Sequence, residues 1–260
     1  MPERKESGDN VPPKIIAVCG KGGVGKTSIS AMMTKILMER GADRILAIDA
    51  DPAVGLATSL SLPVHKTVDD IRNDLIRDVQ SGRPGDHREI LNRLDYDVLE
   101  ALVEERNLAF LAIGRPETEG CYCQVNDLLK EIISGLSQNF DVVIIDGEAG
   151  IEQVNRRVME TVTHLILVSD TSQKGIHVCQ TIKQVAASAI AYQQDGLIVN
   201  RVREEDAALL PRLLHLNPIG TLPESEEVRR FDMEGQSLLS LPDCAALEAV
   251  RRCLIHIGLL

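Results

Sequence analysis

Short runs of consecutive aliphatic residues recur along this chain and alternate with longer amphipathic stretches. Runs of this kind are typical of strands in a parallel sheet that is buried on both faces. They predict strands at 15–18, 45–48, 108–113, 142–145, 165–168, 197–199 and 219–222. The amphipathic stretches predict helices at 28–40, 127–137, 152–161, 175–188, 204–214, 224–233 and 243–257.

This alternation predicts an α/β fold, with a doubly wound, mainly parallel sheet flanked by helices. Residues 69–106 are polar and rich in charge, and we expect further helices there. Residues 1–13 are polar and contain Gly and Pro, which predicts a flexible N-terminal tail. Since no linker interrupts residues 14–260, we expect them to form a single domain.

Composition narrows the possible functions. The chain has 44% hydrophobic residues but only 2% aromatic ones and no Trp, so Val, Ile, Leu and Ala must build its core. A net charge of −11 argues against nucleic-acid binding, which needs clustered Lys and Arg. Neither a membrane-spanning run nor a signal peptide is recognisable, and six cysteines in a chain of this length do not suggest a disulfide scaffold. We therefore expect a cytoplasmic protein.

A glycine-rich segment, GKGGVGKT at 20–27, follows the first predicted strand. It satisfies the phosphate-loop (P-loop) pattern G-x-x-x-x-G-K-[ST], in which glycines let backbone N–H groups approach phosphates. Strand before and helix after make a chance match in a Gly-rich turn a poor explanation. We expect Lys26 to reach the β- and γ-phosphates and the Thr27 hydroxyl to bind Mg²⁺. The nucleotide contacts expected here are Gly20, Lys21, Gly22, Gly23, Val24, Gly25, Lys26, Thr27 and Ser28.

Two other predicted strands end in carboxylates. The strand at 45–48 leads into Asp49-Ala50-Asp51-Pro52, and the strand at 142–145 leads into Asp146. In a parallel sheet these ends would lie beside the P-loop. We expect Asp51 to orient the attacking water, and Asp49 and Asp146 to serve the Mg²⁺ shell. An ordinary strand-ending turn is the alternative for Asp49 and Asp51.

Cys121 and Cys123 form a C-x-C pair in a loop flanked by Gly and Glu. Two thiolates at this spacing can face one metal ion, and a helix predicted nearby, with Asn126 as its N-cap, would favour the thiolate form. Two sulfurs do not complete the tetrahedral site of Zn²⁺ or the square-planar site that suits Ni²⁺. The alternative is that both cysteines are small core residues.

Together the P-loop, the D-A-D-P segment and the strand ending in Asp146 resemble the deviant Walker A ATPases, P-loop NTPases that include MinD, ParA and the nitrogenase iron protein. The resemblance implies that Lys21 acts in trans, across a homodimer with nucleotide at its interface. It also implies adenine contacts from Asn200 and Arg201, and from Pro223 and Glu224. A dimer would in turn bring four sulfurs together.

The C-Y-C segment, followed by D-G-E-A-G-I-E at 146–152, further resembles the CooC group of nickel-inserting ATPases, over residues 14–260. That group matures carbon monoxide dehydrogenase, and its AcsF branch serves acetyl-CoA synthase. The resemblance implies an ATPase with ATP or ADP and Mg²⁺, and implies that Cys121 and Cys123 bind Ni²⁺, or Zn²⁺ in its place. Residues 69–106 match no pattern of the group, so the client enzyme stays open.

Two other functions fit parts of the sequence. A MinD- or ParA-like ATPase would regulate a partner or a membrane, and residues 245–260 contain Arg251, Arg252 and many aliphatic residues. An Fe–S scaffold or electron donor would use the same two cysteines. The other cysteines, at 19, 179, 244 and 253, are expected to be structural, and the six histidines are assigned to no metal.

Overall fold

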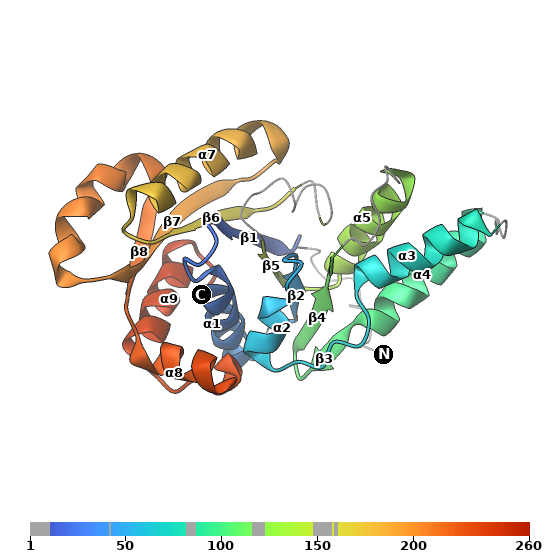
Figure 1. Cartoon of the computed structure of the whole chain (residues 1–260), viewed down its shortest axis with the longest axis horizontal. Helices are drawn as coiled ribbons and strands as arrows, with labels where there is room; N and C mark the ends of the chain where they lie inside the picture. Colours follow the sequence, from blue (N-terminus) through green and yellow to red (C-terminus); the bar gives the residue numbers. More distant parts are fainter. Residues whose placement is uncertain (1–10, 42, 82–86, 116–122, 148–157, 159–160) are drawn as a thin grey trace.

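One eight-stranded sheet runs through the molecule (Figure 1). The computed structural model describes residues 11–41, 43–81, 87–115, 123–147, 158 and 161–260. The strand order is β3-β4-β2-β5-β1-β6-β7-β8, and β3 pairs antiparallel with β4 while the other paired neighbours are parallel. The strands are β1 (Lys14–Gly20), β2 (Ile45–Asp49), β3 (Val103–Glu105), β4 (Leu108–Ala112), β5 (Val142–Asp146), β6 (His164–Ser169), β7 (Gln194–Val202) and β8 (Pro218–Pro223).

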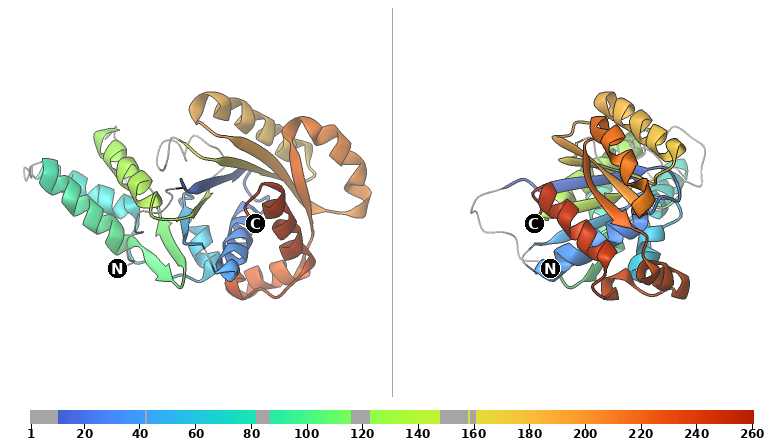
Figure 2. Two further views of the ribbon diagram at one scale, coloured as in Figure 1. Left: turned by 180° about the vertical axis from the view of Figure 1, so that it is seen from behind. Right: turned by 90° about the vertical axis from the view of Figure 1, so that its left-hand side faces the viewer.

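Helices cover both faces of this sheet, as the two views in Figure 2 show. They are α1 (Lys26–Arg40), α2 (Gly55–Leu60), α3 (Val68–Gln80), α4 (His87–Ala101), α5 (Cys123–Ser137), α7 (Gln173–Ala189), α8 (Glu226–Glu234) and α9 (Ala245–His256), with 3₁₀ helices η1 (Glu204–Leu216) and η2 (Leu238–Ser240). The predicted doubly wound α/β fold is confirmed.

Side chains of each central strand alternate between two cores, because successive residues of a strand point to opposite faces. Ile16 and Val18 of β1 pack in the core that holds α1 and α9. Ile15 and Ala17 pack in the other core, with α5 and α7. The strands are consequently buried on both faces, which is why they appear in the sequence as continuous aliphatic runs.

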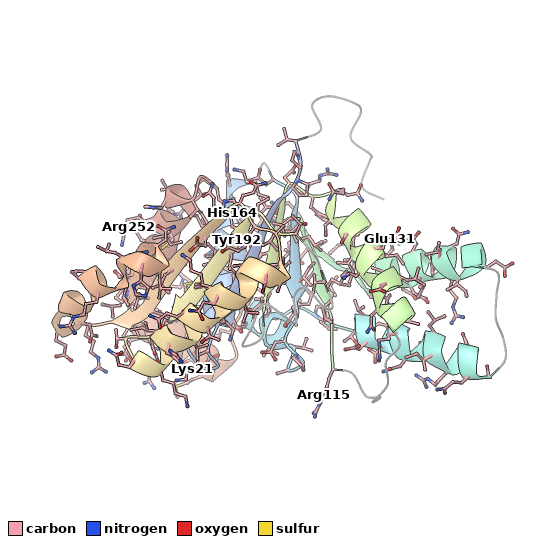
Figure 3. All side chains as sticks on the ribbon, turned by 90° about the horizontal axis from the view of Figure 1, so that it is seen from above. Lys21, Arg115, Glu131, His164, Tyr192 and Arg252 are labelled. Atoms are coloured by element: carbon pink, nitrogen blue, oxygen red, sulfur yellow. The ribbon has the colours of Figure 1, made fainter. Side chains whose placement is uncertain are left out.

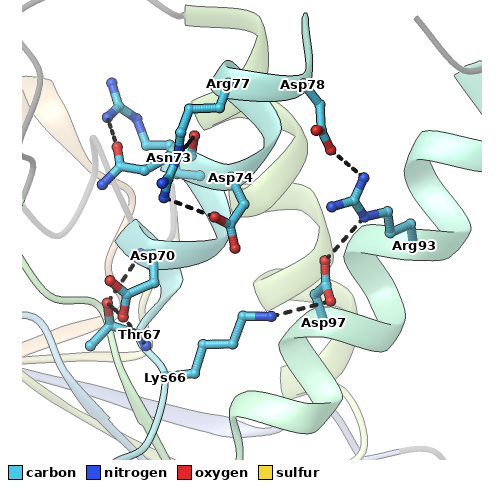
Figure 4. Close-up of polar contacts among 10 residues, drawn as sticks. Lys66, Thr67, Asp70, Asn73, Asp74, Arg77, Asp78, Arg93 and Asp97 are labelled. Carbon is cyan, nitrogen blue, oxygen red and sulfur yellow. Dashed lines mark hydrogen bonds and ion pairs between the residues drawn. The ribbon is translucent and has the colours of Figure 1, made fainter. Parts of the chain in front are cut away.

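Helices α3, α4 and α5 form an arm at the β3–β4 edge of the sheet, and Figure 1 shows α3 and α4 extending away from it. The inner surfaces of these helices pack through Ile71, Leu94 and Leu129, each nearly fully buried. Figure 4 shows Arg93 of α4 between Asp78 and Asp97; its ion pair with Asp78 joins α4 to α3, and its ion pair with Asp97 lies within α4. Helices α3 and α4 confirm the helices expected within residues 69–106, except that residues 103–105 form the strand β3 and residues 82–86 lie outside the described residues.

Several elements differ from the predictions. The edge strand β3 and the six-residue helix α2 were not predicted, and residues 204–216 form a 3₁₀ helix instead of an α-helix. Helix α5 begins at Cys123, so the prediction that it begins after an Asn126 cap was wrong. The Asn126 side chain instead accepts a hydrogen bond from Arg72 Nε at 2.8 Å. The helix predicted at 152–161 falls almost entirely outside the described residues.

Candidate functional site

The P-loop joins the end of β1 to the start of α1 at the centre of the sheet, where the chain turns to β2 on one side and later to β6 on the other. Its backbone requires glycine. A Cβ on Gly20 would lie 2.1 Å from the Val168 carbonyl oxygen. Gly23 and Gly25 have φ values of 82° and 96°, in the left-handed region. Helix α1 starts directly after Gly25, so its free N–H groups point at the loop.

Two lysines lie in this loop in different environments. Lys26 is 7% exposed, and its Nζ donates a hydrogen bond to the Lys21 carbonyl oxygen at 3.4 Å. Lys21 is half-buried, and Figure 3 shows it on the same side of the molecule as Arg115 and opposite His164, which begins β6. Burial alone would raise the pKa of Asp170, but hydrogen bonds from Ser172 and the charge of Lys21 outweigh it and lower that pKa. Lys21 thus places a positive charge near Asp170, at the beginning of the loop.

Asp49 and Asp146 end neighbouring strands in register with each other, and both are buried. The two oxygens of Asp146 accept hydrogen bonds from Thr27 Oγ1 at 2.8 Å and from Ser30 Oγ at 2.9 Å. Burial raises the pKa of Asp146 to about 6, against those two hydrogen bonds. Burial, and then the charge of Asp146, raises the pKa of Asp49 to about 7. Two carboxylates and a hydroxyl in this position are the oxygen donors that Mg²⁺ prefers.

Ser30 was missed by the sequence reasoning. It lies three residues after Thr27, and side chains at this spacing share one face of a helix. Both hydroxyls therefore reach the same carboxylate. The Thr27-x-x-Ser30 spacing after the P-loop was the available signal.

Asp49 also organises the segment that follows it. Its Oδ1 accepts a hydrogen bond from Asp51 N at 3.1 Å, and its Oδ2 accepts one from Leu56 N at 2.8 Å at the start of α2. Asp51 Oδ1 in turn accepts from Ala53 N at 2.9 Å, in a tight turn. The strand-ending turn that was the alternative for Asp49 and Asp51 is thus present in the structure. The half-buried Asp51 lies beside the acid pair.

Asn200 and Arg201, near the end of β7, contact the P-loop directly. Asn200 Nδ2 donates to the Val24 carbonyl oxygen at 2.8 Å, and Arg201 Nη1 donates to the Gly23 carbonyl oxygen at 3.1 Å. A Cβ on Gly25 would lie 2.4 Å from Asn200 Nδ2. The two residues expected at adenine therefore also support the loop that would hold the phosphates.

Pro223 ends β8, and Glu224 follows it. Glu224 forms an ion pair with Arg203 at 3.5 Å, and its side chain is 53% exposed. In the sheet order, β6 and β7 lie between this segment and β1, which leads into the P-loop.

Of the C-x-C pair, Cys121 lies outside the described residues and Cys123 is the first residue of α5. Helix α5 follows β4, which runs parallel to β2, β5 and β1, so it begins on the side of the sheet where these strands end and where the P-loop lies. Within the described part of the chain, no group of three or more His, Cys, Asp and Glu side chains is arranged to hold a metal ion. A complete metal site would need ligands from beyond this set.

The cysteines expected to be structural are mostly buried. Burial raises the pKa of Cys19 and Cys179 to about 12 and that of Cys253 to about 11, so these thiols stay protonated at neutral pH. Cys244 is half-buried at the start of α9. Burial confirms Cys19, Cys179 and Cys253 as core residues.

Helix α9 was the candidate membrane-surface helix. Its apolar residues Leu247, Val250 and Leu254 are buried in the core with α1, and Arg251 and Arg252 both pair with Glu248. No helix among the described residues is both long and apolar enough to cross a membrane. The apolar face of α9 is therefore used within the fold.

Comparisons with known proteins agree with this geometry. The family model described as the CobQ/CobB/MinD/ParA nucleotide binding domain matches residues 15–239. An uncharacterized ATP-binding protein of Methanocaldococcus jannaschii is 37% identical over 233 residues, which cover 88% of this chain and 92% of that protein. The carbon monoxide dehydrogenase accessory protein CooC of Rhodospirillum rubrum is 28% identical over 244 residues, covering 88% and 91%. Among solved structures, a ParA family ATPase from Chlorobium tepidum has a TM-score of 0.68 at 19% identity, covering 96% and 100%.

Proposed function

Because this chain belongs to the CobQ/CobB/MinD/ParA nucleotide-binding family, we propose that it is an ATP-dependent, dimeric metallochaperone that carries nickel to an enzyme. The observation that carries this proposal is that α5, which starts at Cys123, begins on the side of the sheet where the parallel strands end, as do the P-loop and the acid pair. The same side of the sheet would then bind both ATP and metal. The 28% identity to a carbon monoxide dehydrogenase accessory protein supports the same conclusion.

The nucleotide would be held mainly by the backbone of residues 20–28. Lys26 would neutralise the β- and γ-phosphates, and Thr27 with Asp146 would hold Mg²⁺. Asp49 would complete the metal's outer shell, and Asp51 would orient the attacking water. Adenine would lie near Asn200, Arg201, Pro223 and Glu224. When bound, Mg²⁺ supplies charge neutralisation at the phosphates.

The dimer explains the two features that one chain leaves incomplete. Lys21 is half-buried at the beginning of the loop, and in the proposal it acts in trans on the nucleotide of a second copy. Two copies of Cys121 and Cys123 would supply the four sulfurs that a square-planar Ni²⁺ or tetrahedral Zn²⁺ site requires. ATP binding would close the dimer and gather the sulfurs, and hydrolysis would release the metal to carbon monoxide dehydrogenase or acetyl-CoA synthase, in the cytoplasm.

Nickel binding by paired variants tests the proposal. We expect one Ni²⁺ per wild-type dimer in equilibrium dialysis with ATP, with the dimer mass measured alongside. The double variant Cys121→Ala/Cys123→Ala should lose this ion. Cys244→Ala, which removes a half-buried thiol elsewhere, should keep it. Nickel bound equally by the double variant would refute the proposal.

The same preparations separate the alternatives. An Fe–S scaffold would be brown when purified without oxygen, with broad absorption around 400 nm. A membrane-regulating ATPase would pellet with anionic liposomes in the presence of ATP. The buried apolar face of α9 and its paired arginines argue against membrane binding by that helix.

A further inference from the structure

The first turn of α3 is fixed against the end of β4. Thr67 and Asp70 cap the helix, because Thr67 N and Oγ1 donate to Asp70 Oδ2 at 2.8 and 2.7 Å (Figure 4). Gly114, just past β4, has a φ of 86°, and a Cβ there would lie 2.6 Å from Thr67 Oγ1. This close approach leaves α3 no room to slide along the strand end.

Backbone hydrogen bonds continue from this turn to the nucleotide side. Asp69 N donates to the Ile113 carbonyl oxygen at 2.8 Å, and Ile113 N donates to the Asp49 carbonyl oxygen at 2.9 Å. Asp49 is the buried acid whose side chain holds the start of α2. The start of α3 is thus two backbone hydrogen bonds away from the acid pair beside the P-loop.

Arg72 joins α3 to α5, one turn further along. It is 6% exposed, and its Nε donates to Asn126 Oδ1 at 2.8 Å, while Nη1 donates to Asn73 Oδ1 at 3.5 Å. Asn126 lies in the first turn of α5, three residues after Cys123. Breaking the hydrogen bond to Asn126 would cost free energy, because it takes an acceptor away from a buried guanidinium. A shift of α3 therefore moves the start of α5 with it.

We propose that Arg72 is a positioning residue that couples the nucleotide-facing end of β2 to the helix beginning at Cys123, through α3 and Asn126. The inference rests on the proposed function in taking Cys123 as a metal ligand. A nucleotide that moves Asp49 and Ile113 shifts α3 as a rigid element, and Arg72 carries the shift to Asn126. By linkage, ATP changes the affinity for the metal, and the metal changes the affinity for ATP, by the same factor.

Thiol labelling in the metal-free protein tests the link directly. The full chain is treated with N-ethylmaleimide with and without ATP and Mg²⁺. Mass spectrometry of its peptides then gives the rate at which Cys123 is labelled. We expect ATP to change the wild-type labelling rate by about fivefold or more. Arg72→Gln and Asn126→Ala should bring this ratio close to one, with the Kd for ATP alone unchanged.

Two variants separate positioning from a general loss of structure. Asn126→Asp keeps the acceptor oxygen and should keep the ATP effect. Arg77→Gln changes the same residue type on the same helix, but at an exposed ion pair with Asp74, and should also keep it. If Arg72→Gln does not fold, Asn126→Ala decides, because it leaves the buried arginine in place.

The possible results separate this inference from the proposed function. A wild-type ratio of one, or a wild-type ratio retained in both Arg72→Gln and Asn126→Ala, would overturn the coupling. A wild-type protein that binds no nickel but shows the ATP effect on Cys123, lost in Asn126→Ala, would refute the metallochaperone and leave the coupling standing.

Discussion

The P-loop region and the helical arm are held together by different means. Around the loop, backbone geometry leaves almost no freedom: Gly20 lies against the Val168 carbonyl, and Asn200 lies against Gly25. In the arm, amphipathic helices pack through a thin apolar layer and are joined at the surface by ion pairs such as Arg93–Asp78. The first arrangement tolerates few substitutions, while the second tolerates many. The coupling proposed through Arg72 would join these two differently built regions.

The largest expected effect comes from adding one methyl group to the loop. Gly20→Ala places a Cβ against a backbone oxygen that cannot move without breaking the β1–β6 pairing, so we expect a loss on the order of 4 kcal/mol and no measurable ATP binding. Gly22→Ala is the matched control, because a Cβ there meets nothing within 4 Å. It should stay within about 0.5 kcal/mol of wild type in urea unfolding. Equal losses for both variants would contradict the geometry described for the loop.

A core truncation in the arm should cost less and leave the nucleotide site intact. Leu94→Ala removes a side chain that is 2% exposed, and we expect it to lower the free energy of unfolding by about 3 kcal/mol. Leu99→Ala, on the same helix but 57% exposed, should change it by less than about 0.5 kcal/mol. The Kd for ATP should be unchanged in both. A large loss of ATP affinity in Leu94→Ala would mean that arm and loop are not the separate regions described above.

The acid pair predicts how stability depends on pH in the absence of Mg²⁺ and nucleotide. The folded-state pKa values of Asp49 and Asp146, about 7 and about 6, lie above their ordinary value of 3.8. Between these values the folded state binds protons that the unfolded state has lost, so stability must fall as pH rises through this window. We expect thermal melts from pH 4.5 to 8 to reveal this fall.

Asp146→Asn should reduce this fall by on the order of 1–2 kcal/mol, because an amide does not titrate and no longer raises the pKa of Asp49 by its charge. Asp51→Asn, at the half-buried carboxyl nearby, is the control and should change the slope much less, because the charge of Asp51 is the weakest of the influences on the pKa of Asp146. A slope that is the same in wild type and Asp146→Asn would show that these carboxyls do not set the pH dependence.

The contrast between the two regions also explains what the sequence could predict. The P-loop and the strands ending in Asp49 and Asp146 are set by local rules, so their positions followed from spacing alone. The Arg72–Asn126 hydrogen bond joins residues 54 positions apart, and no local pattern specifies which helices meet. For the same reason the start of α5 was misplaced, because Asn126 is a preferred N-cap residue and its actual partner lies on another helix. The three-residue strand β3 carries too little pattern to be recognised, and pairing with β4 determines it.

The smallest effect is expected at the surface of the arm. Arg93 reaches both Asp78 and Asp97, but its side chain is 55% exposed, and exposed ion pairs contribute little because water and salt screen them. Arg93→Ala should therefore cost less than about 1 kcal/mol in urea unfolding at low salt, and less still in 1 M NaCl. A double-mutant cycle with Asp78→Ala isolates the pair itself. A coupling energy that is large and insensitive to salt would mean that the surface ion pair holds α3 and α4 together as firmly as backbone geometry holds the loop.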